Sequence, residues 1–227
     1  MPKQTKKQKS TSELAAKGKE KHQISDAVKL LKSFPPCKFD QSVEIAFHLA
    51  IDPRQADQQL RGSVSMPKGV GRSARVVCFC NSDKVEAAKA AGAIEAGSED
   101  LVKKIEGGWL DFDVAIATPD EMRFVGKLGR ALGPKGLMPS PKAGTVTPDF
   151  ETAVAEFAAG KVEYRNDEGG NIHCVVGKMS FSEEDLIENL NFFINMITKS
   201  RPAAVKGEFV KKCVISATMT PSVRIDV

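Results

Sequence analysis

Two short runs of uninterrupted apolar residues constrain the fold of this chain more than any other feature. Residues 75–80 and 113–117 each read as a strand without a polar side, and helical patterns at 82–91 and 99–106 lie between them. Strands that are apolar on both faces and alternate with helices are typical of a parallel sheet covered on both sides. A further helix start is predicted at Thr118, which is followed by proline and then by a glutamate at the third position.

The two ends of the chain have a different pattern, in which apolar and polar residues alternate. Residues 43–49 and the end of the chain, 210–227, alternate in this way, and residues 162–176 read as a hairpin with its turn at 167–170. Helical patterns cover 25–34, beginning at a capping serine, and 182–201. Each end holds about 65 residues, which is marginal for an independent core, so we expect the two ends to pair.

The sequence therefore predicts an α/β protein with two domains. The first is discontinuous and joins residues 1–66 to 160–227, and the second is an insert of residues 67–159. Residues 1–22 are rich in lysine and have no apolar core, so we expect a mobile basic arm and not a secretory signal. No run of about 18 apolar residues is present, and no transmembrane helix is expected.

The charges are grouped along the chain. The first 21 residues hold seven lysines and two acids, whereas the remainder is close to neutral. Two further segments, 58–82 and 122–148, carry four and five basic residues respectively and no acidic ones. Such groups suit a polyanion such as nucleic acid. A solvated loop or a disordered tail is the alternative interpretation of each segment.

No residue pattern indicates catalysis or metal binding. The three histidines, at 22, 48 and 173, are isolated, and the five cysteines form no C-x-x-C pair. The glycines at 69–71 precede a predicted strand, and the glycine-rich segment 133–142 lacks the Gly-Lys-Ser/Thr end of a phosphate-binding loop. We therefore expect reduced thiols in a cytosolic protein, with no cofactor and no metal. A nucleotide-binding enzyme of the α/β class is the alternative, because a fold alone permits it.

One long motif resembles a known family. Residues 111–120 read DFDVAIATPD, and residues 125–147 read VGKLGRALGPKGLMPSPKAGTVT. Shorter matches follow in order along nearly the whole chain, among them KFD at 38–40 and TMTPSVR at 218–224. The chain is similar to the bacterial form of the L-one family, the large-subunit ribosomal proteins of the mobile stalk beside the tRNA exit site.

The resemblance implies a fold and a function. The fold would be a discontinuous split βαβ (ferredoxin-like) domain with an inserted Rossmann-like parallel α/β domain. The protein would be non-enzymatic, part of the 50S ribosomal subunit in the cytoplasm, a monomer when free, and without a membrane partner. The family binds a stalk region of large-subunit (23S-type) rRNA, assists the movement and release of deacylated tRNA, and in bacteria represses translation of its own operon mRNA.

Motif matching also implies which residues of the first domain contact rRNA. The cations would meet phosphates, the hydroxyls would read ribose 2′-hydroxyls, and the apolar side chains would contact sugar or base; the alternative role is packing at strand ends. The residues are Lys38, Phe39, Ser42, Glu44, Arg165, Asn166, Asp167, His173, Thr218, Met219 and Ser222. Three positions depart from the pattern. Thr220 stands where the family usually has glycine, and its side chain would crowd the RNA or alter a turn. Ser140 replaces a common asparagine, and Gln55 replaces an arginine.

The acid-free segment of the insert is left for a second polyanion. Four of its five basic residues, Lys127, Arg130, Lys135 and Lys142, are expected to face tRNA, and prolines and glycines stiffen the loop that carries the last two. Direct contact with rRNA, or packing of this loop against its own sheet, are the alternatives. Gly126 and Gly129 lie inside the preceding helix pattern, where close approach of a phosphate or another segment would explain them.

Overall fold

A computed structural model gives the fold and describes residues 6–227. The chain is a mixed α/β protein, and its internal contacts divide it into two compact units. The first unit combines the residues up to Gly71 with Tyr164–Val227, and the second unit is Arg72–Glu163. The crossings expected from the sequence, at 66–67 and 159–160, lie four or five residues earlier in the chain.

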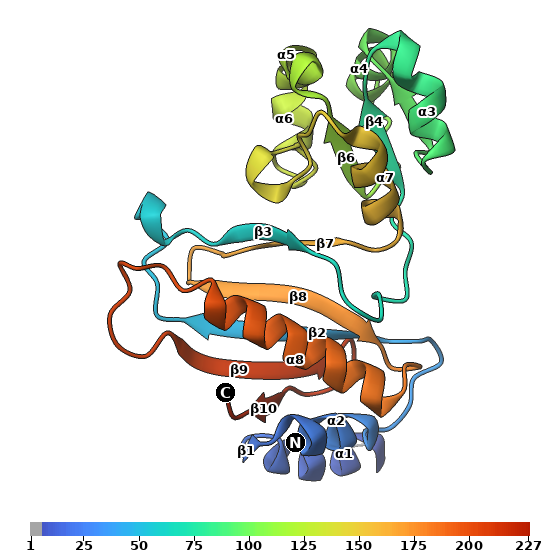
Figure 1. Cartoon of the computed structure of the whole chain (residues 1–227). Coiled ribbons are helices and arrows are strands. Elements are labelled where there is room, and N and C mark those ends of the chain that lie inside the picture. Colours follow the sequence, from blue (N-terminus) through green and yellow to red (C-terminus); the bar gives the residue numbers. More distant parts are fainter. Residues whose placement is uncertain (1–5) are drawn as a thin grey trace. The chain divides into compact units, whose positions relative to one another are not determined.

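The first unit is built on a five-stranded sheet with the strand order β1-β10-β9-β2-β8 (Figure 1). Neighbouring strands are antiparallel, except that β1 and β10 are parallel. The strands are β1 (Lys21–His22), β2 (Ser42–Leu49), β8 (Asn171–Lys178), β9 (Val210–Ala217) and β10 (Val223–Ile225). Both ends of the chain therefore contribute to one sheet, with β2 between two strands from the C-terminal part.

Helices α2 (Ile24–Lys32) and α8 (Glu183–Lys199) cover one face of this sheet (Figure 1). The apolar residues of β2 are buried against them while Glu44 and His48 are exposed, so the alternation predicted from the sequence is confirmed. Phe193 of α8 packs on Phe47, with ring centroids 5.9 Å apart. The other face of the sheet carries the polar residues of each strand, which is where side chains remain accessible.

The hairpin predicted at 162–176 forms only next to its turn, where Asn166 and Ile172 make one antiparallel bridge, and its two strands belong to different sheets. β7 (Val162–Arg165) pairs with β3 (Arg61–Val64) in a separate two-stranded sheet. Asn166, directly after β7, extends this pairing by two hydrogen bonds to Leu60: its backbone N donates to Leu60 O at 3.0 Å, and its Oδ1 accepts from Leu60 N at 2.9 Å. The predicted turn at 167–170 forms, but it leads from one sheet into the other.

The described part of the basic N-terminal segment is regular, where a mobile arm was expected. Residues Lys6–Lys17 form helix α1, and β1 follows it and pairs with β10. The run of alanine, leucine, glutamate and lysine in 13–17 favours helix, and propensity explains the difference. Residues 1–5 of the predicted arm lie outside the described residues. Helix α2 also begins earlier than predicted, because Gln23 and not a serine occupies its N-cap.

The second unit holds a parallel sheet of three strands in the order β5-β4-β6, as the apolar runs predict. Its strands are β4 (Val76–Phe79), β5 (Glu95–Gly97) and β6 (Val114–Ala117). Its longer helices are α3 (Val85–Ala90), α4 (Glu99–Glu106) and α7 (Phe150–Ala158). Short helical turns make up the rest: η2 (Ser82–Lys84), η3 (Pro119–Glu121), α5 (Met122–Val125), η4 (Gly126–Leu128), α6 (Gly129–Leu132) and η5 (Pro141–Ala143), while η1 (Ala56–Gln58) belongs to the first unit.

Both faces of this small sheet are covered, which explains why β4 has no polar side. Val77 and Phe79 face a core shared with α4 and the segment 125–132, whereas Val76 and Cys78 face a core shared with α3 and α7. All four residues of β4 are fully buried. The sequence did not lead us to expect β5, which is three residues long, or α7, which Asp149 caps by accepting from the backbone N of Thr152 at 3.5 Å.

The helix predicted after Thr118 is broken into short turns. Thr118 occupies the N-cap and Pro119 the first turn, but the threonine side chain makes no capping bond. Glu121 is buried and accepts a hydrogen bond from the Ser98 hydroxyl, so the predicted capping box is wrong. The glycines that interrupt this segment have a strong helix-weakening effect, which accounts for the change to η3, α5, η4 and α6.

Candidate nucleic-acid interface

Several of the predicted rRNA-binding residues meet at the start of β2. The loop after β9 is joined to β2 by three hydrogen bonds between Ser42 and Thr218. Ser42 N donates to Thr218 Oγ1 at 3.2 Å, Thr218 N donates to Ser42 O at 3.2 Å, and Thr218 Oγ1 donates to Ser42 O at 3.5 Å. The sequence separates these residues by more than 170 positions, and the β2–β9 register brings them together. The Thr218 side chain is exposed beside this contact, so a hydroxyl is presented at the sheet end.

The same end of the sheet exposes two large apolar side chains. Phe39 is 53% exposed and Met219 is 67% exposed, although apolar side chains of this size are usually buried. Gln41 connects their two loops: it is 3% exposed, and its Oε1 accepts from Met219 N at 2.8 Å. Exposed apolar side chains that are held by a buried polar anchor suggest contact with a partner.

Lys178 belongs to this end of the sheet, although motif reasoning did not select it as a contact. Its Nζ donates to Ser42 Oγ at 2.9 Å, and the register places it opposite Ser42 across β2 and β8. Lys38 is exposed in the loop before β2 and forms no ion pair within residues 6–227. Lys178 would have been found by considering, for each candidate residue, the residue that pairs with it on the neighbouring strand.

Thr220, one of the residues that depart from the family pattern, closes a turn. The Thr220 hydroxyl accepts from Ala217 N at 2.9 Å, and Thr220 N donates to Ala217 O at 3.0 Å. No residue other than glycine has a positive φ in the described chain, so this turn does not need a glycine at 220. Thr220 therefore stabilises the loop that presents Met219, and its hydroxyl is turned toward the backbone. Ser222 follows as an exposed residue before β10.

The remaining predicted residues gather at the opposite end of β2. Arg165 is the last residue of β7 and Asn166 follows it, and the turn that comes next lies beside Leu49, whose N donates to Gly170 O at 3.0 Å. Six residues of β2 separate this end from Ser42, or about 20 Å. The motif residues thus form two groups on one sheet, and Glu44 and His173 lie on the accessible face between them.

The carboxylate of Asp167 forms hydrogen bonds within its own turn. Its Oδ1 accepts from Gly169 N at 2.8 Å and from Asn171 N at 2.7 Å. Hydrogen bonds from the Asn171 side chain, and then from its backbone, hold the pKa of Asp167 below its usual value. Asn166 is similarly occupied with Leu60. These two residues fix the shape of the turn, which leaves Arg165 and His173 as the exposed cation and imidazole at this end.

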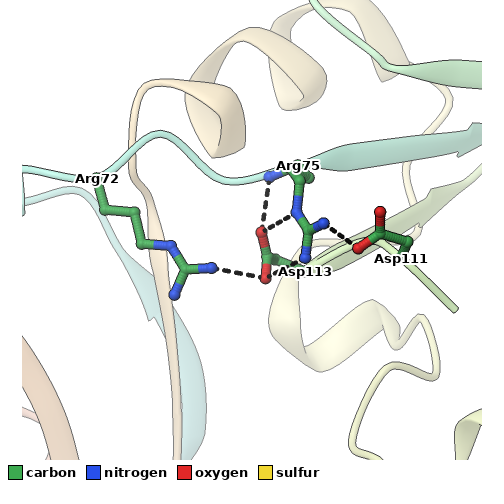
Figure 2. Close-up of polar contacts among 4 residues, drawn as sticks. All are labelled: Arg72, Arg75, Asp111 and Asp113. Carbon is green, nitrogen blue, oxygen red and sulfur yellow. Dashed lines mark hydrogen bonds and ion pairs between the residues drawn. The ribbon is translucent and has the colours of Figure 1, made fainter.

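The first acid-free segment, 58–82, does not present a free basic surface. Arg72 and Arg75 both bind Asp113, and Arg75 also pairs with Asp111 (Figure 2). Lys68 lies 3.7 Å from Asp185 and 3.4 Å from Glu188. Acids from distant parts of the sequence therefore neutralise this segment, and interpretation of it as a polyanion surface is not supported.

The second acid-free segment differs from the first. Lys127, Arg130, Lys135 and Lys142 are all exposed, and none forms an ion pair within the part of the chain that the structure describes. Lys127 Nζ lies 5.5 Å from the centroid of the Phe124 ring. A Cβ built on Gly126 or Gly129 would meet no atom within 4 Å, so packing within the chain does not require these glycines.

Chemistry other than binding finds little support in residues 6–227. No group of three or more histidine, cysteine or acidic side chains is placed to hold a metal ion there. All five cysteines are free, and burial raises the pKa of the Cys174 and Cys213 thiols to about 12, which keeps them protonated. In the same residues, no helix has the length and apolar character needed to span a bilayer.

Comparison with known proteins agrees with the motif. The model of the ribosomal protein L1p/L10e family matches residues 30–221. The large ribosomal subunit protein uL1 of Kosmotoga olearia is 50% identical over 226 residues, which cover 100% of this chain and 97% of the relative. The uL1 proteins of Lactobacillus delbrueckii subsp. bulgaricus and Lactiplantibacillus plantarum are 51% and 52% identical over 205 residues, or 90% of this chain and 89% and 90% of each relative. The chain therefore belongs to the ribosomal protein L1p/L10e family.

Proposed function

We propose that the chain binds large-subunit rRNA of the ribosomal stalk through the start of β2 and the loop after β9. The observation that carries this proposal is the pair of exposed apolar side chains, Phe39 and Met219, anchored by the buried Gln41. Around them lie the hydroxyls of Ser42 and Thr218 and the ammonium of Lys178. Phosphate and 2′-hydroxyl contacts are the means by which proteins recognise the shape of RNA, and apolar side chains add contact with sugars or unstacked bases.

The other motif residues have graded roles in this proposal. Arg165 and His173 meet the RNA about 20 Å away, at the far end of β2. Asp167 and Asn166 shape that end through the hydrogen bonds that their side chains make within the protein. Glu44 accepts hydrogen bonds from ribose hydroxyls or base amino groups on the face between the two ends.

We also propose the domain arrangement that the family implies. The first unit would be a split βαβ domain that binds rRNA, and the second would be an inserted Rossmann-like domain. Support comes from the five-stranded sheet shared by both chain ends and from the parallel order β5-β4-β6. The protein would act on the ribosome in the cytoplasm as a constituent of the 50S subunit.

Two further partners follow from the same reasoning. The exposed cations of segment 122–148 that form no ion pair within residues 6–227 would attract deacylated tRNA and assist its movement and release from the exit site. A site that reads RNA by shape would also accept a similar fold in the mRNA of the protein's own operon, and binding there would repress translation. The second role uses the same residues as rRNA binding, so rRNA and mRNA should compete.

The test of rRNA binding is the introduction of a negative charge at each member of the apolar pair. Phe39→Asp and Met219→Asp should each weaken binding to a transcript of the rRNA stalk region by about 1–3 kcal/mol, because each removes apolar contact and sets an anion beside phosphates. Ile94→Asp is the matched control, because Ile94 is 50% exposed and lies in the other unit. Equal affinity of all three variants and the wild type in a filter assay would remove this surface from the site.

A further inference from the structure

A straight row of side chains crosses the accessible face of the five-stranded sheet. The pairings His173–Ala46, Ala46–Val214, Val214–Arg224 and Arg224–Lys21 place these five residues opposite one another on successive strands. Paired residues point to the same side of a sheet, and four strand spacings make the row about 19 Å long. We refer to these five residues as the cross-strand row.

The row has a small apolar centre between polar ends. Ala46 and Val214 are half-buried, and their short side chains leave the backbone of the sheet open to a close approach. His173 is exposed at one end, beside the turn formed by Asp167. At the other end Lys21 pairs with Asp226 at 2.8 Å, whereas Arg224 forms no ion pair within residues 6–227.

A second unpaired cation stands beside the row. Lys212 lies opposite His48 and two residues before Val214 on β9, so it points to the same face. Its side chain is exposed, and no carboxylate in the described chain pairs with it. Arg224 and Lys212 therefore stand beside the apolar centre of the row without an ion pair in residues 6–227, although Glu208 and Asp226 line the same hollow. Glu44, on the same face, lies toward the other end of β2 and two residues from Ala46.

This composition favours one kind of ligand contact. The strand residues of this face include no phenylalanine, tyrosine or tryptophan, and the rings that it offers to a base are the imidazoles of His48 and His173. Contact with a sugar–phosphate backbone requires cations and space for close approach, and the two cations and the short side chains of the row provide both. We propose that the cross-strand row is a track for the RNA backbone, with Arg224 and Lys212 as phosphate contacts that motif matching does not assign.

This inference rests on the proposed rRNA binding and extends its footprint across the sheet. The RNA that touches Phe39 and Met219 at one end of β2 continues over Ala46 and Val214. Recognition of RNA shape stays at the β2 start, and the row adds affinity that depends on salt. The two contributions are separable, because removal of a cation that neutralises a phosphate changes the salt dependence of binding.

The test is the double variant Lys212→Gln with Arg224→Gln, measured against a transcript of the rRNA stalk region at several salt concentrations. We expect affinity to fall roughly tenfold at moderate salt, and the slope of log K against log salt to become shallower by about 0.7–0.9 for each phosphate that is no longer neutralised. The matched control is Lys29→Gln with Lys199→Gln, which removes the same charge from exposed positions on the covering helices α2 and α8.

A second variant guards against loss of structure at Arg224. Ala46→Glu places an acid in the centre of the cross-strand row, on the accessible face where it disturbs no core packing. This variant should bind the transcript at least tenfold more weakly and keep an unchanged circular dichroism spectrum. If the wild type binds the transcript but both test variants match the control in affinity and salt slope, the track is overturned and the proposed function stands. If the wild type does not bind the transcript, the proposed function fails and the track fails with it.

Discussion

Arg75 forms hydrogen bonds to the Asp113 carboxylate with both its backbone and its side chain. The Arg75 backbone N and Nε each donate to Asp113 Oδ2 at 3.1 Å, and Arg72 Nη2 donates to Oδ1 at 2.9 Å (Figure 2). Arg75 immediately precedes β4 and Asp113 immediately precedes β6, which are parallel neighbours. The contact therefore aligns the two strands at their first residues, and it lies where the chain enters the second unit.

Acid should weaken this contact in a defined pH range. Hydrogen bonds from the Arg75 side chain are the main cause that holds the pKa of Asp113 below its usual value. A depressed pKa in the folded state stabilises the protein above the unfolded value, and that stabilisation is lost as pH falls through the folded value. We expect Asp113→Asn to be less stable than the wild type at pH 7, and the difference to shrink below about pH 4.

Fluorescence offers a local measurement of this effect. Trp109 is the only tryptophan in the sequence and packs on Phe112 in the second unit, with ring centroids 5.6 Å apart. Urea unfolding followed by its emission at about pH 7, 5 and 3 should give the expected convergence. Asp120→Asn, at an exposed carboxylate without an ion pair in residues 6–227, is the control and should run parallel to the wild type. Parallel behaviour of Asp113→Asn would contradict the prediction.

A buried amide should dominate the stability of the segment through which the chain leaves the first unit. Asn189 of α8 is 0% exposed and makes three hydrogen bonds: it accepts from Lys68 N at 3.0 Å and donates to Gly69 O at 2.9 Å and to Val176 O at 2.8 Å. Asn189→Ala leaves these backbone groups without their partner, and we expect a loss of about 2–4 kcal/mol in the free energy of unfolding.

The control for this variant lies on the same helix. Asn191 is exposed, so Asn191→Ala should change the free energy of unfolding by less than about 0.5 kcal/mol. Urea unfolding followed by far-ultraviolet circular dichroism provides the comparison. Similar midpoints for the two variants would show that solvent replaces the missing bonds, and the proposed role of Asn189 would be wrong.

The periodicity of apolar residues was sufficient to predict most of the helices and strands. It failed where a contact between residues distant in sequence determines which strands pair. The buried run of β4 and the alternation of β2 were readable, since each records which faces are covered. The hairpin at 162–176 was readable only next to its turn, and the pairing of β7 with β3, which Asn166 extends to Leu60 across more than 100 positions, was not. The motif led to a family of ribosomal proteins, so the prediction that the chain is not an enzyme is confirmed by the comparisons.

The sequence predicted most residues of the candidate site, but it could not distinguish residues that are exposed to a partner from residues that hold the loops in shape. Phe39 and Met219 are exposed, whereas Asp167 is occupied with its own turn, and only the contacts distinguish them. The acid-free segment 58–82 illustrates the same limit. Its cations are neutralised by acids that lie far away in sequence, such as Asp113 and Asp185, and local charge counting does not detect them.

Replacing Thr220 by glycine tests whether this departure from the family pattern is harmful. If the hydroxyl stabilises the turn, Thr220→Gly should reduce the free energy of unfolding by about 1–2 kcal/mol and weaken RNA binding a few-fold, because the loop that presents Met219 becomes looser. Thr220→Ser keeps the hydroxyl and should resemble the wild type. Tighter RNA binding by the glycine variant would show instead that Thr220 crowds the RNA.

Neutralising the basic surface of the second unit should separate its role from rRNA binding. The four exposed residues Lys127, Arg130, Lys135 and Lys142 have no ion-pair partner in the described chain, so their field is available to an external polyanion. Changing all four to glutamine should leave affinity for the rRNA stalk transcript nearly unchanged. It should slow the release of deacylated tRNA, or change its occupancy of the exit site, on reconstituted ribosomes, and the effect should fade as salt rises.

The informative control for that variant removes charges that are already paired. Lys104 and Lys161 of the same unit form ion pairs with Glu95 and Glu156, so glutamine at these two positions changes net charge without removing a free cation. If the fourfold variant loses rRNA affinity while tRNA occupancy stays normal, the surface belongs to the rRNA site. Only the fourfold variant removes cations that a phosphate backbone can reach without competition from a carboxylate. If the paired-lysine control alters tRNA occupancy as much as the fourfold variant does, the net charge of the unit and not this particular surface determines tRNA occupancy.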